Sequence, residues 1–349
     1  MQVVHLQDYG FVPDIIGTSC TNSIQLKDLD FRVPCGKCYY CQKKRRSEWS
    51  LRLEHEYMFS DSAHFITLTY NDQSLPFSWL KPKQLKDDKG NVIKRWKEVI
   101  HSPYPTLNKK HLQDYIKRLR NSHKAYLKNE QRKVNKEFKI TGKPIRYYAV
   151  GEYGSKDHTR RPHYHLLLFN YDIANVDNII SQWKNTTTGQ QMGHVDVGEV
   201  TSASINYVTK YMFKDFNKRT DTRQSPFSVM SKKPIIGNDY IVNYGKFHTQ
   251  NEQLQVADKN GHLRRLPKAY LYRLWYNEFE VLGKKYRVKD TLKIKELSKK
   301  NHDEFIKSRM KRYEDTILKH YNGDTLEYER SLESDIDRQK RNINFKETI

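Results

Sequence analysis

The stretch Arg161-Pro162-His163-Tyr164-His165-Leu166-Leu167-Leu168-Phe169 is the part of the chain from which the fold is inferred most directly. Its apolar second half predicts a β-strand. Because residues two apart on a strand face the same side, His163 and His165 are expected side by side, whereas Leu166 and Leu168 face a core. Two imidazoles at this spacing can chelate one divalent cation. The alternative is that both histidines are ordinary polar residues of a sheet face.

The sequence on either side of this stretch predicts further strands and helices. Strands rich in aromatic and β-branched residues are expected at 64–70, 146–151 and 194–200. Helices are expected at 39–58, from an Asn108 cap onward, at 177–183, and from a Ser202 or Ser204 cap to about residue 213. The order of elements indicates an α+β fold, with an antiparallel sheet and helices on one face of it.

Smaller features complete this outline. The first helix is expected to bury a stripe at spacing four (Trp49, Leu53, Tyr57), and the second a stripe at Leu112, Tyr115, Ile116 and Leu119. Hairpins are expected at 88–91 and at 260–261. An aromatic, basic helix is expected at about 267–279, closed by Gly283, and a charged helix over about the last 50 residues.

The composition predicts a folded protein with a polyanionic partner. Aromatic residues make up 12% of the 349 residues, which is more than disordered chains carry. The formal net charge is +22, and because residues 301–349 hold 10 basic and 11 acidic residues, residues 1–300 hold +23. Nucleic acid is the commonest polyanion in a cell, although a generally basic protein is the alternative. With no recognisable signal peptide and no apolar run near the ~20 residues of a membrane span, the cytoplasm is the expected compartment.

A carboxylate precedes the histidine strand. Glu152 ends the preceding expected strand, within Gly151-Glu152-Tyr153-Gly154. If the two strands pair through a turn, Glu152 can reach both histidines as a third ligand and leave positions open for water and phosphate oxygens. The alternative is a solvated carboxylate at a strand end.

Two phenols follow within an expected short helix. In Tyr207-Val208-Thr209-Lys210-Tyr211, a spacing of four places both tyrosines on one helix face, with Lys210 close to that face and Lys214 beyond it. Aromatic residues at this spacing usually belong to a core. Combined with a metal site on a basic chain, however, they are what phosphodiester transfer through a covalent phosphotyrosine requires.

Four stretches, in this order and spacing, resemble the HUH endonucleases, and more closely the replication initiators of small single-stranded DNA phages (Microviridae, gokushovirus-like). They are Phe65–Tyr70, Gly151–Gly154 with Arg161–His165, Tyr207–Tyr211, and Met230–Gly237. The segment Pro34–Cys41 and the basic helix after it also resemble these phage proteins. The resemblance covers roughly residues 30–240.

The resemblance implies a five-stranded antiparallel sheet, with Mg²⁺ or Mn²⁺ bound by Glu152, His163 and His165. It implies rolling-circle replication, in which Tyr207 and Tyr211 alternate as nucleophiles. One nicks a strand at the replication origin and stays on its 5′ end, and the other later releases a circular strand. Single-stranded DNA and the origin are the implied partners, with a host helicase and polymerase, in the cytoplasm of a bacterial host and away from membranes.

Four regions are expected along the chain: an N-terminal cysteine-containing segment with a basic helix (1–60), an endonuclease core (61–215), a basic accessory region (216–299) and a charged helical tail (300–349). Lys210 is expected to assist catalysis. The residues expected to contact DNA phosphates are Lys43, Lys44, Arg45, Arg46, Arg161 and Lys214. A basic run on a helix is equally typical of a solvated face.

The cysteines form a separate pattern. Cys35, Cys38 and Cys41 are spaced by two residues, and Cys20 supplies a fourth thiol. This predicts a structural Zn²⁺ site. The alternatives are free thiols in a reducing compartment and, less favoured, an iron–sulfur cluster.

Three other functions fit parts of the pattern. A histidine-triad nucleotide hydrolase would need a third histidine where this chain has Leu167. A plasmid mobilisation relaxase shares the chemistry but usually differs in size and motif order. A basic single-stranded-DNA-binding or packaging protein without catalysis would bind DNA in a way that depends on salt and ignores divalent metal.

Overall fold

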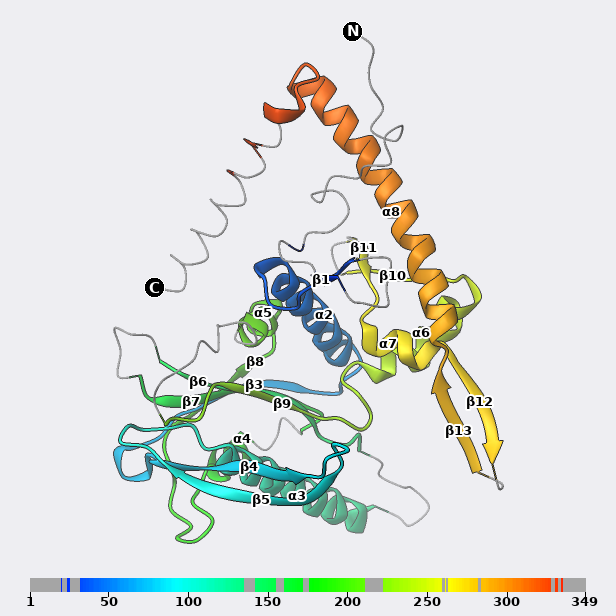
Figure 1. Cartoon of the computed structure of the whole chain (residues 1–349). Helices are drawn as coiled ribbons and strands as arrows, with labels where there is room; N and C mark the ends of the chain where they lie inside the picture. The colour runs from blue at the N-terminus through cyan, green and yellow to red at the C-terminus, as the bar shows by residue number, and fades with distance from the viewer. Residues whose placement is uncertain are drawn as a thin grey trace. The chain divides into compact units, whose positions relative to one another are not determined.

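The computed structural model describes residues 20, 24–25, 32–134, 142–154, 160–171, 176–210, 222–258, 261, 263–281, 284–327, 330–331 and 334 (Figure 1). The chain divides into two compact units. One is continuous, Trp49–Tyr240, and contains the histidine strand. The other combines Met1–Glu48 with Ile241–Ile349.

The unit Trp49–Tyr240 is built on a five-stranded antiparallel sheet. Its strands are β3 (Ala63–Leu68), β6 (Arg146–Tyr153), β7 (Pro162–Phe169), β8 (Val195–Glu199) and β9 (Phe227–Met230). They lie in the order β8-β3-β7-β6-β9, and every neighbouring pair is antiparallel. The histidine strand β7 is therefore central and paired on both edges. The expected α+β fold and antiparallel sheet are confirmed.

Hydrophobic cores lie on both faces of this sheet. Leu166 and Leu168 of β7 belong to one core, and Leu167 and Phe169 belong to the other. The expectation that helices cover only one face is wrong, because β7 is apolar on both sides after the histidines and each side needs cover. The first core is covered by α3 (Lys109–Lys133) and α4 (Val176–Ser181), and the second by α2 (Tyr39–Met58) and α5 (Ser202–Lys210) (Figure 1).

Helix α3 begins where the sequence predicts. The side-chain oxygen of Asn108 accepts hydrogen bonds from the backbone N–H groups of Lys110 (3.0 Å) and His111 (3.4 Å). These bonds satisfy two donors that the first helical turn leaves unpaired. The predicted stripe is confirmed, since the buried residues of α3 are Leu112, Tyr115, Ile116 and Leu119.

The predicted stripe of α2 is only partly correct. Leu53 is fully buried and Trp49 half-buried, but Tyr57 is 47% exposed. Four residues advance a helix by about 40° more than one full turn. Two such steps carry Tyr57 away from the face that buries Leu53.

A buried ion pair links α2 to the edge of the sheet. The guanidinium of Arg146 pairs with the carboxylate of Glu56, and it also donates to the carbonyl of Ile235 (2.7 Å). Glu56 also accepts a hydrogen bond from the N–H of Gly237 (2.6 Å). Both side chains are less than a tenth exposed. The pair therefore has partners on every side, which a buried charge needs.

Arg146→Met is expected to lower the free energy of unfolding by about 3–5 kcal/mol, because it leaves the Glu56 carboxylate buried without its counter-charge. Urea denaturation followed by circular dichroism measures the loss. The double variant Arg146→Met, Glu56→Leu should recover part of it, since no buried charge remains. A single-variant loss below about 1 kcal/mol would show that Glu56 does not depend on Arg146.

A long two-stranded ribbon leaves the same unit. Strands β4 (Ser78–Lys86) and β5 (Val92–His101) pair with each other, as the expected hairpin at 88–91 requires. The N–H of Gly90 donates to the carbonyl of Asp87 (2.9 Å), and Gly90 has a φ of +81°, in the region that favours glycine. The short helix η2 (Asp72–Ser74) precedes the ribbon.

The second unit is built from short elements and one long helix. These are β1 (Ile24–Gln25), β2 (Arg32–Val33), α6 (Asn238–Gln250, entering from the first unit), β10 (Gln255–Ala257), β11 (Leu263–Arg265), α7 (Lys268–Leu274), β12 (Tyr276–Val281), β13 (Lys284–Lys289) and α8 (Thr291–His320). Its buried residues include Leu266, Tyr270, Leu271 and Trp275. The pairing of β10 with β11 confirms the hairpin expected around Asn260-Gly261, and α8 confirms the start of the charged helix.

The helix expected at 267–279 is wrong in its second half. Helix α7 ends at Leu274, and Tyr276–Val281 is a strand paired with β13. From Tyr276 onward, polar and apolar residues alternate with the period of a strand, and this shorter pattern prevails over the helical one before it.

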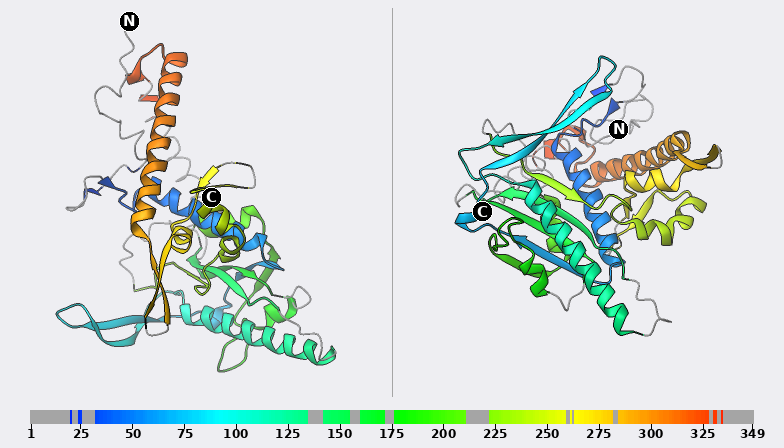
Figure 2. Two further views of the ribbon diagram at one scale, coloured as in Figure 1. Left: turned by 90° about the vertical axis from the view of Figure 1, so that its right-hand side faces the viewer. Right: turned by 90° about the horizontal axis from the view of Figure 1, so that it is seen from below.

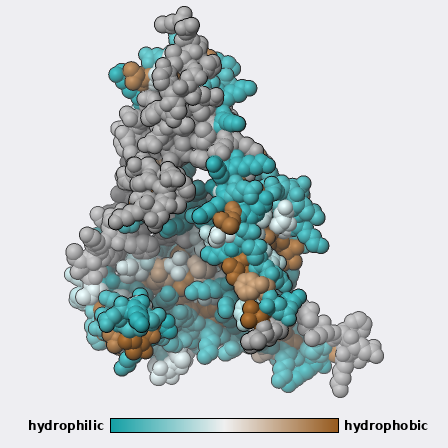
Figure 3. Space-filling model, turned by 45° about the vertical axis from the view of Figure 1, so that its right-hand side comes forward, coloured by the Kyte–Doolittle hydropathy of each residue, from teal (hydrophilic) through white to brown (hydrophobic). Residues whose placement is uncertain are grey.

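No helix in the described part of the chain combines the length and the apolar character needed to cross a lipid bilayer. On the face drawn in Figure 3, hydrophobic residues form small separate areas within a mainly hydrophilic surface. This surface agrees with a chain in which 30% of the residues are charged.

Candidate metal centre and nucleophile

The strand register brings the two histidines and Glu152 together. In the pairing of β6 with β7, Glu152 lies directly opposite His163. Cross-strand partners share a face of the sheet, and so do residues two apart on one strand. All three side chains therefore meet on one face. Nε2 of His163 and Nε2 of His165 lie 3.1 Å and 3.0 Å from the same oxygen, Oε1 of Glu152.

The outer nitrogens of both rings have separate partners. Nδ1 of His163 lies 3.2 Å from the carbonyl oxygen of Arg161, and Nδ1 of His165 lies 3.2 Å from Oγ1 of Thr67. A carbonyl only accepts, so Nδ1 of His163 carries the proton. Nε2 of that neutral ring is then a lone-pair donor facing a carboxylate oxygen. Such an arrangement is stable only if a cation, either a second proton or a metal ion, lies between these atoms. The donor set therefore fits a divalent metal ion.

Burial gives these groups unequal acid strengths. Burial lowers the pKa of His165 below its usual value and so favours its neutral, ligating form, although Glu152 opposes this shift. Burial alone would raise the pKa of Glu152, but its hydrogen bonds to His163 and His165 outweigh burial and lower that pKa. The carboxylate is thus charged at neutral pH, even though its side chain is only 3% exposed.

Tyr207 lies against this cluster. Its hydroxyl oxygen is 3.4 Å from Nε2 of His165, and the two rings meet edge to face with centroids 4.9 Å apart. The ring of Phe65 stacks on His165 and touches Tyr207 edge-on, at centroid distances of 5.7 Å and 6.2 Å. Tyr207 is 38% exposed, so its hydroxyl is accessible from solvent while it faces the cluster.

Helix α5 presents Tyr207 because of how it begins. The helix starts at Ser202, and Thr201 precedes it as N-cap: the N–H of Ser204 donates to Oγ1 of Thr201 (3.2 Å), and the N–H of Thr201 donates to Oγ of Ser204 (2.8 Å). The expected cap at Ser202 or Ser204 is therefore wrong, with Thr201 as the cap and Ser204 as its partner. Ile205 and Val208 enter the core, which leaves Tyr207 on the side facing the metal ligands.

Not every predicted catalytic residue can be located. Lys210, half-buried, is the last residue of α5. Tyr211 and Lys214 lie outside the described residues. The pairing of the two tyrosines on one helix face therefore stays a prediction.

Phe65 and Thr67 are not singled out individually by the sequence pattern. Both lie on β3 at alternate positions, and Thr67 is the register partner of His165. Their signal is the strand motif itself: alternate residues of a neighbouring strand lie on the ligand-bearing face.

Residues 63–216 match a family model of replication-associated proteins, the ORF2 family, and this segment contains Glu152, both histidines and Tyr207. This part of the chain belongs to the replication-associated protein ORF2 family. The predicted resemblance to phage replication proteins is thereby confirmed.

Three relatives of the chain come from phages or viruses of bacteria. It is 29% identical to replication-associated protein VP4 of Bdellovibrio phage phiMH2K over 297 residues, which cover 82% of this chain and 80% of the relative. It is 27% identical to replication-associated protein ORF2 of Spiroplasma virus 4, covering 71% and 70%. It is 25% identical to replication-associated protein ORF4 of Chlamydia phage 1, covering 63% and 48%. No solved structure matches the chain.

The four cysteines lie before the family segment 63–216 and form a second cluster. One sulfur from each of Cys20, Cys35, Cys38 and Cys41 lies within 4.8 Å of the others. Sγ of Cys35 accepts hydrogen bonds from the N–H groups of Lys37 (3.4 Å) and Cys38 (3.2 Å), and Sγ of Cys20 accepts one from Cys35 (3.2 Å). The set can hold one metal ion with four sulfur ligands.

The turn between Cys35 and Cys38 is formed by glycine. Gly36 has a φ of +74°, a conformation that other residues rarely adopt. The backbone hydrogen bonds lower the pKa of Cys35, whereas burial raises the pKa of Cys41 to about 12. The turn thus directs N–H groups at one thiol, as metal-binding cysteine turns need.

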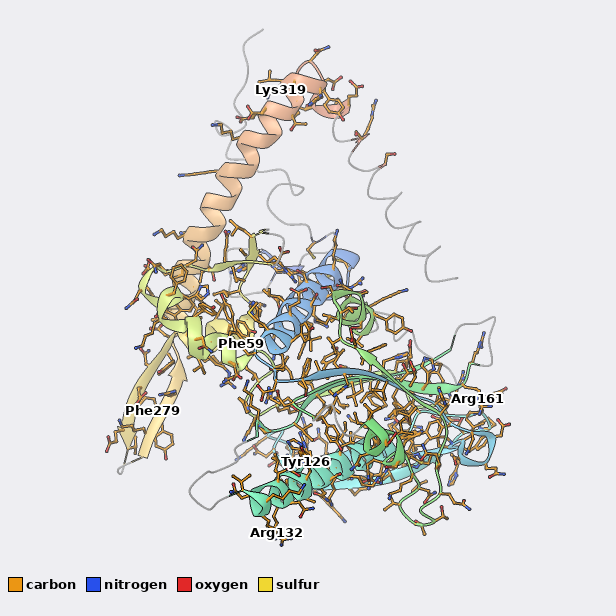
Figure 4. All side chains as sticks on the ribbon, turned by 180° about the vertical axis from the view of Figure 1, so that it is seen from behind. Phe59, Tyr126, Arg132, Arg161, Phe279 and Lys319 are labelled. Atoms are coloured by element: carbon orange, nitrogen blue, oxygen red, sulfur yellow. The ribbon has the colours of Figure 1, made fainter. Side chains whose placement is uncertain are left out.

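The basic residues predicted to contact DNA differ in their surroundings. Lys43, Lys44 and Arg45 are exposed on α2, and Arg46 is half-buried. The guanidinium of Arg161, labelled in Figure 4 where β7 begins, donates to the carbonyl of Tyr70 (2.8 Å) and pairs with the carboxylate of Asp72. Arg161 therefore holds the segment that follows β3, and its partly exposed end is all that remains for a phosphate.

Proposed function

We propose that this protein initiates DNA replication by nicking one strand at a replication origin and rejoining it later, with Tyr207 as a nucleophile. One observation carries the proposal: the hydroxyl of Tyr207 lies 3.4 Å from His165, whose same nitrogen lies 3.0 Å from Glu152. A phenol beside a two-histidine, one-carboxylate set is the arrangement that metal-assisted phosphoryl transfer to tyrosine needs. The family of the chain, replication-associated proteins, supports DNA as the substrate.

The chemical step transfers one phosphodiester bond. The hydroxyl oxygen of Tyr207 attacks phosphorus, an O–P bond forms, and the bond between phosphorus and the 3′ oxygen breaks. The phenolic proton passes to water, and the departing 3′ oxygen takes up a proton. The 5′ end of the strand stays on tyrosine as a phosphodiester, so a later 3′-OH can reverse the step and rejoin DNA without a nucleotide cofactor.

The residues proposed to hold the catalytic metal ion are Glu152, His163 and His165. Two nitrogen donors and one carboxylate oxygen suit Mn²⁺ well and accept Mg²⁺, and they leave coordination positions open. A bound ion would polarise the scissile phosphate and offset the charge that develops on its oxygens. Thr67 and the Arg161 carbonyl hold the two rings with their Nε2 atoms turned inward.

Tyr211 is proposed as the second nucleophile, which attacks the regenerated junction after one round of synthesis. Lys210 is proposed to place its positive charge near the transferred phosphate, as are Lys214 and the basic start of α2. Unwinding and synthesis would fall to a host helicase and polymerase, inside the bacterial host cell.

A DNA-binding or packaging protein without catalysis is the main rival. It gives no reason for two imidazole lone pairs and a buried carboxylate to converge beside a partly exposed phenol. A plasmid mobilisation relaxase would share the chemistry, but the relatives matched over most of the chain are phage or viral replication-associated proteins.

The experiment is an adduct assay. Purified protein is incubated with an end-labelled, single-stranded oligonucleotide that carries the cognate origin, with Mn²⁺ or with EDTA, and the products are run on a denaturing gel. A labelled band at the size of the protein, present with Mn²⁺ and absent with EDTA, is expected. Salt-sensitive binding with no adduct on any origin-spanning DNA would favour the packaging protein.

We further propose that the four cysteines hold a structural Zn²⁺ ion. Four sulfur ligands close the coordination shell, which is the mark of a structural rather than a catalytic site. The N–H groups that point at Cys35 and Cys20 stabilise thiolate charge. Such an ion would tie Cys20 to the start of α2 and so fix the chain before the basic face of that helix.

Zinc removal tests this proposal. Metal analysis of protein purified without added metal is expected to find roughly one zinc per chain, and the Cys35→Ser, Cys38→Ser double variant is expected to lose it and to melt at lower temperature. His163→Ala is the matched control, because it should keep the zinc while losing the adduct. Four titratable thiols and no metal would refute the site, and iron with bound sulfide would replace zinc by a cluster.

A further inference from the structure

The β4–β5 ribbon is the most exposed regular element of the unit Trp49–Tyr240. In the left view of Figure 2 its tip reaches beyond the sheet and α3 of the same unit. Among the described residues, β4 and β5 pair only with each other, so both outer edges carry unpaired backbone groups. An isolated two-stranded ribbon is at best marginally stable in water. A ribbon nine to ten residues long on each side therefore requires a reason other than core formation.

Its apolar side chains are not buried. Leu85 is 51% exposed, Trp96 44% and Val99 52%. Tryptophan is rarely left in solvent without a binding role, and large exposed aromatic residues are enriched where a partner docks. The ribbon thus carries contact residues without a partner inside the chain.

The ribbon is also strongly basic. Residues 78–101 contain seven Lys/Arg and three Asp/Glu, a net charge of +4. Two of the three acids have partners within the ribbon: Asp87 accepts from the backbone and side chain of Asn91, and Glu98 pairs with Lys83 at 3.1 Å. The remaining lysines and Arg95 face solvent.

The register places base and aromatic ring on one face. Trp96 lies opposite Lys83, and Lys94 and Lys81 belong to the neighbouring pairs on that face. Three ammonium groups therefore surround one exposed indole. The other face of the ribbon carries Lys97 and Arg95, so positive charge lies along both sides.

The base of the ribbon is fixed close to the candidate metal centre. Thr106, just after β5, meets the hydroxyl of Tyr153 (3.3 Å), and Tyr153 directly follows Glu152 on β6. The indole N–H of Trp79 also donates to the carbonyl of Thr222 (2.9 Å). A partner held by the ribbon would therefore lie next to the end of the sheet that carries the ligands.

We propose that the β4–β5 ribbon enters the major groove of duplex DNA beside the nick site. The major groove admits a two-stranded β-ribbon, and lysines on both faces of such a ribbon can reach the phosphates of both groove walls. Lysines along the strands also oppose pairing with a strand of another protein, which favours DNA over protein as the occupant. The choice of DNA rests on the proposed function.

The test compares duplex and single-stranded binding. The triple variant Lys81→Gln, Lys94→Gln, Lys97→Gln is measured by fluorescence anisotropy on a labelled duplex and on one of its strands, in EDTA and over a range of salt concentrations. We expect duplex affinity to fall at least about tenfold at 0.1 M salt, and the slope of log K against log salt to shrink by about 2–3. Trp96→Thr should weaken duplex binding while leaving that slope unchanged.

The matched control removes the same charge from α3. Lys117, Lys124 and Lys128 are exposed lysines of the same unit, and the triple change to Gln should leave duplex affinity within about twofold. An equal loss in this control would show that only net charge matters, and it would overturn the proposal. An equal loss for single strand and duplex in the ribbon variant would also overturn it, as would a change of oligomeric state without loss of DNA.

The adduct assay separates this inference from the proposed function. On a short single-stranded oligonucleotide, the ribbon variant should form the covalent adduct as the wild type does, because Tyr207 and the metal ligands are untouched. If the wild type forms no adduct but the ribbon variant loses duplex binding, the proposed chemistry fails and the ribbon assignment stands.

Discussion

Tyr207→Phe is expected to lower the yield of the first covalent protein–DNA adduct roughly a thousandfold or more, because the change removes only the attacking oxygen. The ring should keep its edge-to-face contacts with His165 and Phe65, so the fold and the metal ligands stay in place. The measurement is the Mn²⁺-dependent adduct on a labelled single-stranded origin oligonucleotide. Mn²⁺ affinity, measured in parallel, should change little.

The control for this prediction is Tyr57→Phe. Tyr57 is a partly exposed tyrosine of similar accessibility, and its loss should leave the adduct unchanged. Tyr211→Phe should still form the first adduct but fail to release a rejoined circle. A normal first adduct in Tyr207→Phe, together with its loss in Tyr211→Phe, would assign the first attack to Tyr211. Adduct formation in the double variant would exclude both phenols.

The central sheet and its ligands could be predicted because their sequence signals are local. His163 and His165 need only the period of a strand to share a face. The position of Glu152 depends on register, which the sequence does not state. It is nevertheless constrained, because a slip of one residue would turn all of β7 over and expose Leu166 and Leu168. The cap at Asn108 was equally local, since one side chain satisfies the first N–H groups of α3.

The errors lie where neighbouring structure decides. Tyr57 has the right spacing but lies beyond the part of α2 that the sheet covers. Tyr276–Val281 follows a helix without a strong breaker, and only its pairing with β13 selects the strand. The second hydrophobic face of the sheet was missed because Leu167 and Phe169 were grouped with the histidines rather than as a core of their own. In each case the local propensity was weak and tertiary packing prevailed.

The site also contains features that no residue spacing reveals. The contact between Tyr207 and His165 joins elements 42 residues apart in sequence. It exists because α5 packs on the face of β7 that carries the histidines. Likewise, Thr67 became part of the site only through its register partner His165. Sequence can propose such residues as a set, but a distance between them requires the fold.

Glu152→Gln is expected to raise the dissociation constant for Mn²⁺ by more than the roughly 10–100-fold that loss of an outer-shell partner costs, and to abolish the adduct at low Mn²⁺. The change keeps the shape and removes the charge that two imidazole nitrogens face at 3.0 and 3.1 Å. In EDTA, however, the melting temperature should stay constant or rise. The glutamine amide can donate to an imidazole nitrogen, whereas the carboxylate only accepts.

These opposite effects separate a metal ligand from a structural carboxylate. Titration of Mn²⁺ by electron paramagnetic resonance gives the affinity, and calorimetry in EDTA gives the melting temperature. Thr67→Val is the matched control: it removes only the hydroxyl beside Nδ1 of His165, so Mn²⁺ binding should weaken by no more than about 10–100-fold. If Glu152→Gln lowered the melting temperature in EDTA and left Mn²⁺ affinity unchanged, the cluster would be a structural hydrogen-bond network and the metal assignment would fail.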